Sequence, residues 1–399
     1  MRNGIERREL LLAGATVATA FGATLKPTRD ARSPPPDLEE AYQAWRTWDD
    51  RQTGSRSLVQ SAILAASAHN TQPWLFCTQP DRLEVSSDEA RNLGAMDPFR
   101  REMHISIGCA LDNLLLEARA QGQHPQLAIV PGTLEQPIGQ LRSKTVAVVE
   151  LSAAPAFVSP LRATIPRRHT NRAAFEPDRP IRGDIQAELA GLVEPDTAVR
   201  LWLLTDAAAR ADFAAATAEA TRAIIDDPIM IGDSDAWFRA TNREIAIHRD
   251  GPTIDAAGLS PLITWLAKIL PAPSAERAHK TWFEHTRDVQ LASAPLFGLI
   301  AVKDLYDREQ AIQAGRLWQR LHLKAVLLGL GAQPLNQLPE RVDRERQRGE
   351  PGRTAKILAG LVPDPTWPVT FAFRIGWPTR AAALSPRRDL ETVMSPASC

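Results

Sequence analysis

Two long apolar segments place the strongest constraint on the fold. One runs from about Arg100 to Gln121 and the other from Asp307 to Gly329, and apolar residues cover much of the surface that each would have as a helix. A helix of this kind needs neighbours on most sides, so each segment predicts a central, heavily buried helix. Gly122 follows the first segment and is well suited to end it. One such helix falls in each half of the chain.

The remaining periodicity mixes helices and strands and predicts an α+β fold with mostly antiparallel sheets. We expect further helices at 38–48, with Asp37 as a cap, and at 55–66, 206–225, 237–248 and 275–288. We expect strands at 75–77, 127–130, 145–151, 296–302 and 369–373. The segment 248–252 reads as a plain connection, with a lid over a site as the alternative.

A polar turn at 66–74 lies between an expected helix and an expected strand. Pro73 moves Gln72 out of helical geometry, so the amide side chains of Asn70 and Gln72 sit on a fixed backbone. Such a turn can offer donors and acceptors to a planar heterocycle. An ordinary helix-terminating turn explains the same composition.

The residues Ser67-Ala68-His69-Asn70-Thr71-Gln72-Pro73-Trp74 resemble the Ser-x-x-Asn-x-Gln-Pro-Trp loop of the FMN-dependent nitroreductase family. In that family the loop lies against the isoalloxazine ring. The resemblance therefore implies that Ser67, Asn70 and Gln72 bind FMN. It also implies a nitroreductase-like fold, with a sheet and a long central helix in each half.

A basic element opens the second half at 165–175. Its arginines, hydroxyl and imidazole suit a phosphomonoester, because Arg binds phosphate bidentately at any physiological pH. A solvated basic turn is the alternative. The element is similar to the Arg-x-Ser/Thr-x-Arg/Lys motif that holds the FMN phosphate in nitroreductases, which implies phosphate contacts from Arg168, His169, Thr170 and Arg172.

Two C-terminal segments extend the resemblance. The glycines of 328–337 let the backbone approach a ligand, and the segment is similar to the family's Gly-Leu-Gly-x-x-Pro turn. This implies that Leu335 and Asn336 meet the flavin through backbone N–H groups. The tail with Arg387 and Arg388 resembles the family's C-terminal arginine segment, which reaches the same phosphate.

The order of these motifs predicts two complementary halves. The first half has the Asn70 loop but no phosphate element, and the second has the phosphate element but no Asn-x-Gln-Pro-Trp loop near 194–206. We therefore expect a fused pseudo-dimer with one FMN site, acting as a monomer, which resembles the double-length Acg-type branch of the family. The expected boundaries are 1–36 for a signal and linker, 37–160 for the first half and 161–399 for the second.

The resemblance implies an FMN-dependent oxidoreductase that takes hydride from NADH or NADPH and passes it to a nitroaromatic or quinone-like acceptor. The flavin carries the chemistry, so no side chain is assigned as catalytic. The alternative is a protein that sequesters FMN without turnover.

Composition excludes several other classes. Lys plus Arg and Asp plus Glu number 47 each, so no bulk field attracts nucleic acid or an anionic membrane. The three cysteines are widely spaced and indicate neither a disulfide framework nor a zinc site, and Cys77 and Cys109 read as small core residues. The histidines lack metal-binding spacing, so no metal site is expected.

The N-terminus carries Arg7-Arg8 before a short, weakly apolar segment rich in small residues. This pattern is typical of a twin-arginine export signal and is too short for a convincing membrane span. A proline-rich linker at 27–36 follows. The sequence thus predicts export to the periplasm or cell envelope, with a fraying helix and a cytoplasmic protein as the alternative.

Overall fold

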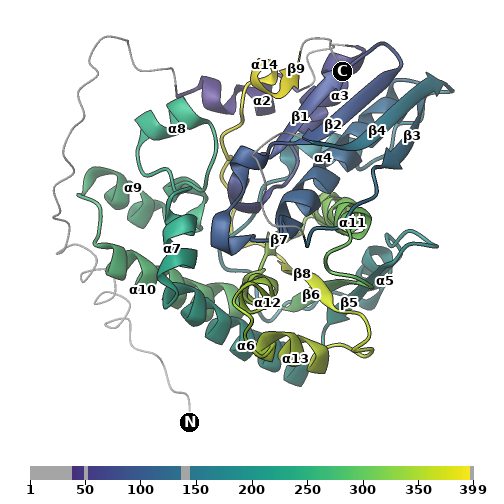
Figure 1. The fold of residues 1–399 in the computed structure, drawn as a ribbon. Coiled ribbons are helices and arrows are strands. Elements are labelled where there is room, and N and C mark those ends of the chain that lie inside the picture. The colour runs from purple at the N-terminus through teal and green to yellow at the C-terminus, as the bar shows by residue number, and fades with distance from the viewer. Residues whose placement is uncertain (1–37, 49–52, 136–143, 396–399) are drawn as a thin grey trace.

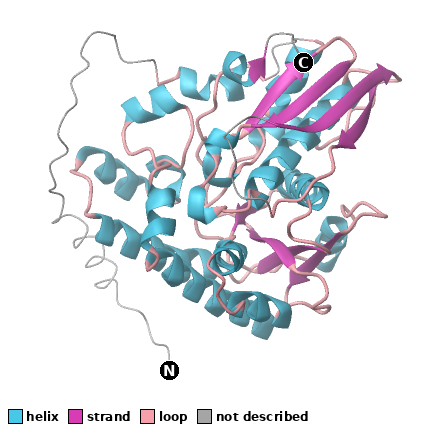
Figure 2. Ribbon diagram, in the orientation of Figure 1, coloured by secondary structure: helices cyan, strands magenta, loops and turns pink. Residues whose placement is uncertain are grey.

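The structure, a computed structural model, describes residues 38–48, 53–135 and 144–395. Asp37, the expected export signal and the linker lie outside these residues. The described chain forms two sheets with two long helices between them and a layer of further helices along one side (Figures 1 and 2). The expected α+β class with two halves, each built on a mostly antiparallel sheet and a central helix, is confirmed.

The first sheet has the strand order β3-β4-β2-β1-β9. Its strands are β1 (Trp74–Thr78), β2 (Arg82–Ser87), β3 (Gln123–Ile129), β4 (Lys144–Ala153) and β9 (Met394–Ser395). All neighbours are antiparallel except β9, which pairs parallel with β1. The C-terminal end of the chain therefore completes the sheet of the first half.

The second sheet has the order β5-β6-β8-β7 and is antiparallel throughout. It contains β5 (Val199–Leu204), β6 (Leu296–Val302), β7 (Gly331–Pro334) and β8 (Val369–Gly376). Every residue of β6 and β8 is buried, because helices cover both faces of these strands. This explains their continuous apolar runs.

The central helices are α4 (Arg101–Ala120) and α11 (Arg308–Leu327), close to the two predicted segments. They cross through a reciprocal glycine contact. A Cβ on Gly108 would lie 2.1 Å from the carbonyl oxygen of Ile312, and a Cβ on Gly315 would lie 1.9 Å from that of Ile105. The two backbones touch, and any larger side chain would separate them.

The same crossing shows a relation between the halves. Arg101, Ile105 and Gly108 occupy the same positions in α4 as Arg308, Ile312 and Gly315 in α11. The glycine of each helix thus contacts the backbone of the isoleucine in the other helix. Gly122 and Gly329, with φ of 74° and 77°, follow the two helices in turn. This reciprocity is what a two-fold relation between repeated halves produces.

The other helices depart more from the sequence expectations. The first-half helices are α2 (Gln43–Arg46), which is only part of the expected 38–48, and α3 (Ser55–Ala62). The expected helix 237–248 begins only at Asn242, because Thr241 and Glu244 form a capping box that fixes its start. The remaining helices are α5 (Gly183–Ala190), α6 (Ala207–Ile225), α7 (Pro228–Asp235), α8 (Asn242–His248), α9 (Pro261–Ile269), α10 (Ala275–His285), α12 (Gln337–Gln347), α13 (Arg353–Gly360) and α14 (Leu390–Val393).

Cys109 is buried and free, as expected of a core residue. Cys77, in contrast, is half-buried and disulfide-bonded, so the reading of Cys77 as a plain core residue is wrong. None of the helices among the described residues is both long and apolar enough to cross a membrane.

Candidate functional site

The Asn70 loop has an unusual backbone. His69, Asn70 and Gln72 all have positive φ, at 45°, 53° and 52°, and none of them is glycine. Each such residue costs on the order of 1 kcal/mol, which the surrounding structure must offset. Ser67 helps, since its hydroxyl accepts a hydrogen bond from the Gln72 N–H at 3.1 Å, and the fully buried Trp74 anchors the following strand. Strain of this kind points to a functional loop.

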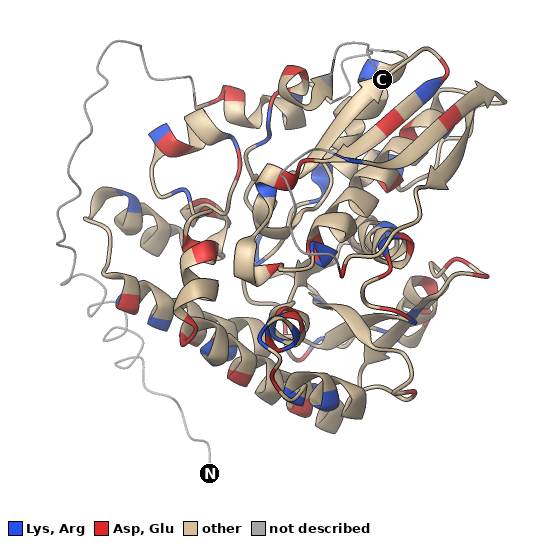
Figure 3. Ribbon diagram, viewed as in Figure 1, with Lys and Arg blue, Asp and Glu red and all other residues tan. Residues whose placement is uncertain are grey.

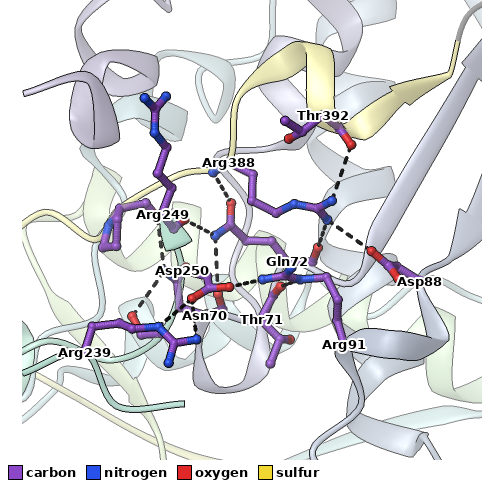
Figure 4. A network of polar contacts seen from close by, with 12 residues as sticks. Asn70, Thr71, Gln72, Asp88, Arg91, Arg239, Arg249, Asp250, Arg388 and Thr392 are labelled. Atoms are coloured by element: carbon purple, nitrogen blue, oxygen red, sulfur yellow. Dashed lines mark hydrogen bonds and ion pairs between the residues drawn. The ribbon is translucent and has the colours of Figure 1, made fainter. Parts of the chain in front are cut away.

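The amide side chains of the loop are engaged from two sides (Figure 4). Asn70 Nδ2 donates to the carbonyl of Pro386 at 3.0 Å, and Gln72 Nε2 donates to that of Arg249 at 2.9 Å. Gln72 Oε1 accepts from the Arg388 N–H at 2.8 Å. The loop thus organises two distant segments around it.

One of these segments is 249–258, here called the strap. The Gly251 N–H donates to the Asn70 carbonyl at 3.3 Å. Asp250, 3% exposed, forms ion pairs with Arg91 and with Arg239, the latter at 2.8 Å (Figure 4). The expectation of a plain connection at 248–252 is therefore wrong, because a buried ion-pair network fixes this segment on the Asn70 loop.

Arg168 and Arg387 form a second feature, a buried arginine pair. They are 1% and 2% exposed. Arg168 donates to the carbonyl of Leu64 at 3.0 Å, and Arg387 donates to Asn70 Oδ1 at 2.5 Å and to the Ala65 carbonyl at 3.2 Å. Neither makes an ion pair with a carboxylate of the described residues. Burial lowers the pKa of Arg168 to about 10, and burial and then Arg168 lower the pKa of Arg387.

Aromatic rings surround the arginine pair. The Trp45 ring lies 4.5 Å from the Arg387 guanidinium and 4.5 Å from the His169 ring, edge to face. His322, fully buried on α11, lies 3.4 Å from Arg168 through Nδ1. Burial, with Arg168 next, lowers the pKa of His169 to about 3, so both imidazoles are neutral and add no charge.

The pair fits an anion. Burying an uncompensated charge is costly, and buried charges are normally paired. Three buried nitrogen atoms here lack any hydrogen-bond partner: Arg168 Nε, Arg387 Nε and His169 Nδ1. A dianionic phosphate would offset both charges and accept from the free donors. Along the ribbon as a whole, by contrast, cationic and anionic residues are interspersed (Figure 3).

The other predicted phosphate ligands lie apart from the pair. Thr170 and Arg172 line a cavity of about 390 Å³ between the strap, α9 and residues 380–383. Arg172 Nη1 donates to the carbonyl of Ala256 in the strap at 3.1 Å. Arg388 has its own carboxylate, Asp88, at 3.4 Å. The structure therefore brings Arg168, His169, Arg387 and Asn70 together, whereas Arg172 lines the cavity beside the strap and Arg388 pairs with Asp88.

Proteins of similar sequence indicate which family the chain resembles. No family model matches the chain. Two proteins from Mycobacterium tuberculosis strains, both provisionally named NAD(P)H nitroreductase, are 26% identical to it over 343 residues, covering 85% of this chain and 90% of theirs. The similarity supports the nitroreductase family.

Several solved structures are also similar to the chain, at lower identity. A provisionally named nitroreductase from Anabaena variabilis covers 88% of this chain and 96% of its own, at 12% identity and a TM-score of 0.43. The FMN-dependent nitroreductase of Mycobacterium smegmatis in complex with NADPH covers 60% of this chain and 98% of its own, at 14% identity and a TM-score of 0.38. A nitroreductase from Desulfitobacterium hafniense, with bound FMN, covers 61% and 100%, at 11% identity and a TM-score of 0.36.

The glycine turn that resembles the nitroreductase turn reaches the phosphate element. The Asn171 N–H donates to the Ala332 carbonyl at 3.0 Å, and Gly331 packs on Phe175. Leu335 and Asn336 do not follow the expectation. The Leu335 N–H donates to the Ala372 carbonyl at 2.8 Å, and the Asn336 side chain is held by Glu102 at 2.7 Å and by the Ala372 N–H. The Leu335 N–H is therefore already engaged by β8, and the Asn336 side chain joins β8 to α4.

Asn336 belongs to a buried cluster of carboxylates, Asp97, Glu102, Glu340 and Asp343, beside a single internal guanidinium, Arg101. Burial, with Asp97 next, raises the pKa of Glu102 to about 8. Among the described residues no group of side chains is suited to hold a metal ion, this cluster included. Glu102 therefore keeps its proton at neutral pH.

Glu102→Gln is expected to raise stability at alkaline pH. In the unfolded chain Glu102 ionises near its ordinary pKa of 4.5, whereas in the folded chain it keeps its proton up to about 8. The folded state therefore binds the extra proton, and the free energy of unfolding of the wild type falls as pH rises from 4.5 to 8. The variant has no carboxylate to ionise, so its advantage in urea unfolding should grow across this range. Exposed Glu219→Gln serves as the control, and parallel pH profiles for Glu102→Gln and wild type would refute the assignment.

Sequence reasoning missed three residues near this site. The sequence places Trp45 only within the expected helix at 38–48, and it assigns no role to His322 or Arg374. His322 had a usable signal, because it is a polar residue on the buried face of α11 beside Trp318 and Leu321. Arg374 is fully buried within β8, where a charged residue among Phe371, Phe373 and Ile375 is itself unusual.

Proposed function

We propose that the protein is an FMN-dependent oxidoreductase of nitroreductase type, with the FMN phosphate held by Arg168 and Arg387. The observation that carries the proposal is the buried arginine pair, which lacks a described carboxylate partner and leaves two guanidinium nitrogens, Arg168 Nε and Arg387 Nε, without a hydrogen-bond partner. Proteins of the family with bound FMN, such as that of Desulfitobacterium hafniense, support the choice of anion.

In this proposal FMN supplies the hydride-transfer chemistry, and the chain supplies position and electrostatics. Asn70 connects the arginine pair to the loop proposed to contact the flavin ring. Its Oδ1 accepts a hydrogen bond from Arg387, and its backbone lies in the strained loop. The strap is hydrogen-bonded to the loop at Asn70 and Gln72. When a flavin ring lies against the amide side chains of Asn70 and Gln72, their hydrogen bonds to the strap carbonyls have to break or to be shared with the flavin.

We also propose that the chain is a fused pseudo-dimer with one FMN site, divided near residue 160 and acting as a monomer. The reciprocal Gly108 and Gly315 contacts support two related halves, as does the pairing of β9 with β1. At the position equivalent to the Asn70 loop, before β5, Glu194 is bound by Arg316 and Arg320 at 2.9 and 2.6 Å. The cavity there is only about 10 Å³, so the second site is closed by an ion-pair network.

The proposed electron donor is NADH or NADPH, and the proposed acceptor is a nitroaromatic or quinone-like molecule. The similarity to NAD(P)H nitroreductases along most of both chains supports the donor. A second candidate, a protein that sequesters FMN without turnover, is favoured by one observation. The strap is fixed on the Asn70 loop by Asp250 and its two arginines.

One experiment separates the two candidates. The purified holoprotein, mixed anaerobically with excess NADPH or NADH, is expected to lose its flavin absorbance within seconds to minutes. Persistent colour with both donors, together with bleaching by dithionite, would favour sequestration. A protein that binds no FMN in equilibrium titration, or binds two per chain, would overturn the proposed site itself.

We also propose that the protein is exported through the twin-arginine pathway. Arg7 and Arg8 support it, as does the disulfide at Cys77, because disulfides persist mainly in oxidising compartments. Replacing both arginines by lysine is expected to retain the protein in the cytoplasm, measured by cell fractionation. An unchanged distribution would remove the export proposal and leave the flavin proposal intact.

A further inference from the structure

A cavity of about 390 Å³ lies beside the phosphate element. Residues 170–173, the strap, helix α9 and residues 380–383 contribute to its lining. Its volume falls within the range of small-molecule sites. The arginine pair, Arg168 and Arg387, does not line it, so the cavity is distinct from the proposed phosphate site.

The charges that line the cavity do not balance. It has three cations, Arg172, Lys268 and Arg380, and one anion, Asp255. Asp255 is already paired with Lys268 at 2.7 Å. Arg172 and Arg380 donate only to backbone carbonyls of the strap, those of Ala256 and Gly258. Neither of these two guanidiniums makes an ion pair with a described carboxylate, so the lining carries a net positive charge.

A fourth cation contacts the 170–173 segment of this lining. Arg374 is fully buried and donates to the carbonyls of Asn171 and Ala173 at 3.3 and 2.7 Å. It fixes the backbone of this segment and adds its charge to that of Arg172. Burial, followed by repulsion from Arg172, lowers the pKa of Arg374 to about 9. An anion in the cavity would relieve this repulsion.

Several of the other lining residues are apolar. Trp265 of α9 lines the cavity while its side chain is 57% exposed, and Leu259, Pro261 and Ala381–Ala383 continue the surface. An exposed tryptophan beside unpaired arginines is suited to a molecule that has an aromatic face and an anionic group.

We propose that this cavity binds a small aromatic carboxylate, with the carboxylate on Arg172, Arg380 and Lys268 and the ring against Trp265. The further statement that the bound molecule is the electron acceptor, an anionic nitroaromatic, rests on the proposed function. The existence of the binding site does not rest on it, because the cavity, its charges and Trp265 are observed without reference to FMN.

The test compares 4-nitrobenzoate with its neutral near-isostere 4-nitrobenzamide by calorimetric titration of the protein as purified. Nitrobenzoate is expected to bind at least fivefold more tightly. Lys268→Met leaves Asp255 unpaired and should remove this preference, while Asp255→Asn frees Lys268 and should strengthen nitrobenzoate binding about fivefold. The control is Lys280→Met, an exposed lysine on α10 outside the cavity, which should leave both affinities within twofold.

Equal binding of the two compounds, no binding, or a preference unchanged in both variants would overturn the inference. The opposite signs of Lys268→Met and Asp255→Asn keep the test decisive when one variant folds poorly. The two proposals can also fail separately. A holoprotein that NADPH bleaches but that does not distinguish the two compounds refutes only the cavity assignment. A protein without FMN that still prefers nitrobenzoate refutes only the proposed function.

Discussion

Replacing Arg168 by alanine is expected to weaken FMN binding roughly tenfold to a hundredfold. The change removes a charged donor to a dianionic phosphate, an interaction worth about 1.5–3 kcal/mol. Equilibrium titration of the FMN-free protein gives the affinity. Arg167→Ala is the matched control, because Arg167 is the preceding residue, carries the same charge and is exposed. Wild-type affinity in Arg168→Ala would exclude Arg168 from the phosphate site.

The same substitution should have the opposite effect on the protein without FMN. Arg168 is 1% exposed and has no carboxylate partner, so removing its charge removes a desolvation cost. We expect the FMN-free variant to unfold at an equal or higher urea concentration than the wild type, despite the lost contact with Leu64. A residue with a purely structural role would lower stability with and without FMN. This pair of effects, weaker binding without loss of stability, is the signature of a binding arginine.

Local patterns predicted the scaffold well. The two long apolar segments fixed α4 and α11 to within about two residues, and the apolar run 296–302 became β6 with the same bounds. These elements are buried on most sides, so their continuous apolar patterns are enough to predict their type and their ends. The predicted start of the helix at 237–248 was wrong. Thr241 and Glu244 form the N-terminal cap, so the helix begins at Asn242 although the apolar period starts earlier.

The site could be predicted only in part, because its partners come from distant segments. The sequence pointed to Asn70, Arg168 and Arg387 through local motifs, and the structure brings these together from opposite parts of the chain. No local pattern contains the Trp45 ring between the arginines, or the strap that contacts Gln72 through Arg249. Arg172 matches the motif position but lines the cavity beside the strap, which the arginine pair does not line.

Gly108→Ala and Gly315→Ala are expected to cause the largest losses of stability. The new Cβ would lie 2.1 Å from the Ile312 carbonyl oxygen in the first variant and 1.9 Å from that of Ile105 in the second, so α4 and α11 would have to separate. Forcing apart a packed backbone contact costs about 1–3 kcal/mol or more, measured as the free energy of unfolding in urea. Gly232→Ala is the control, because Gly232 lies in α7 with nothing within 4 Å of its Cβ position. That variant should be stabilised by about 0.5–1 kcal/mol, since alanine loses less backbone freedom than glycine on folding.

The double variant tests whether the two glycines act at one crossing. Both contacts lie between the same two helices, so the separation produced by the first alanine relieves part of the clash of the second. The two losses should therefore sum to more than the loss in the double variant, a coupling expected of neighbouring sites. Simple additivity would mean that the helices adjust independently at the two points. In that case the reciprocal contact would not be a single interface, and the fused pseudo-dimer would lose its main structural support.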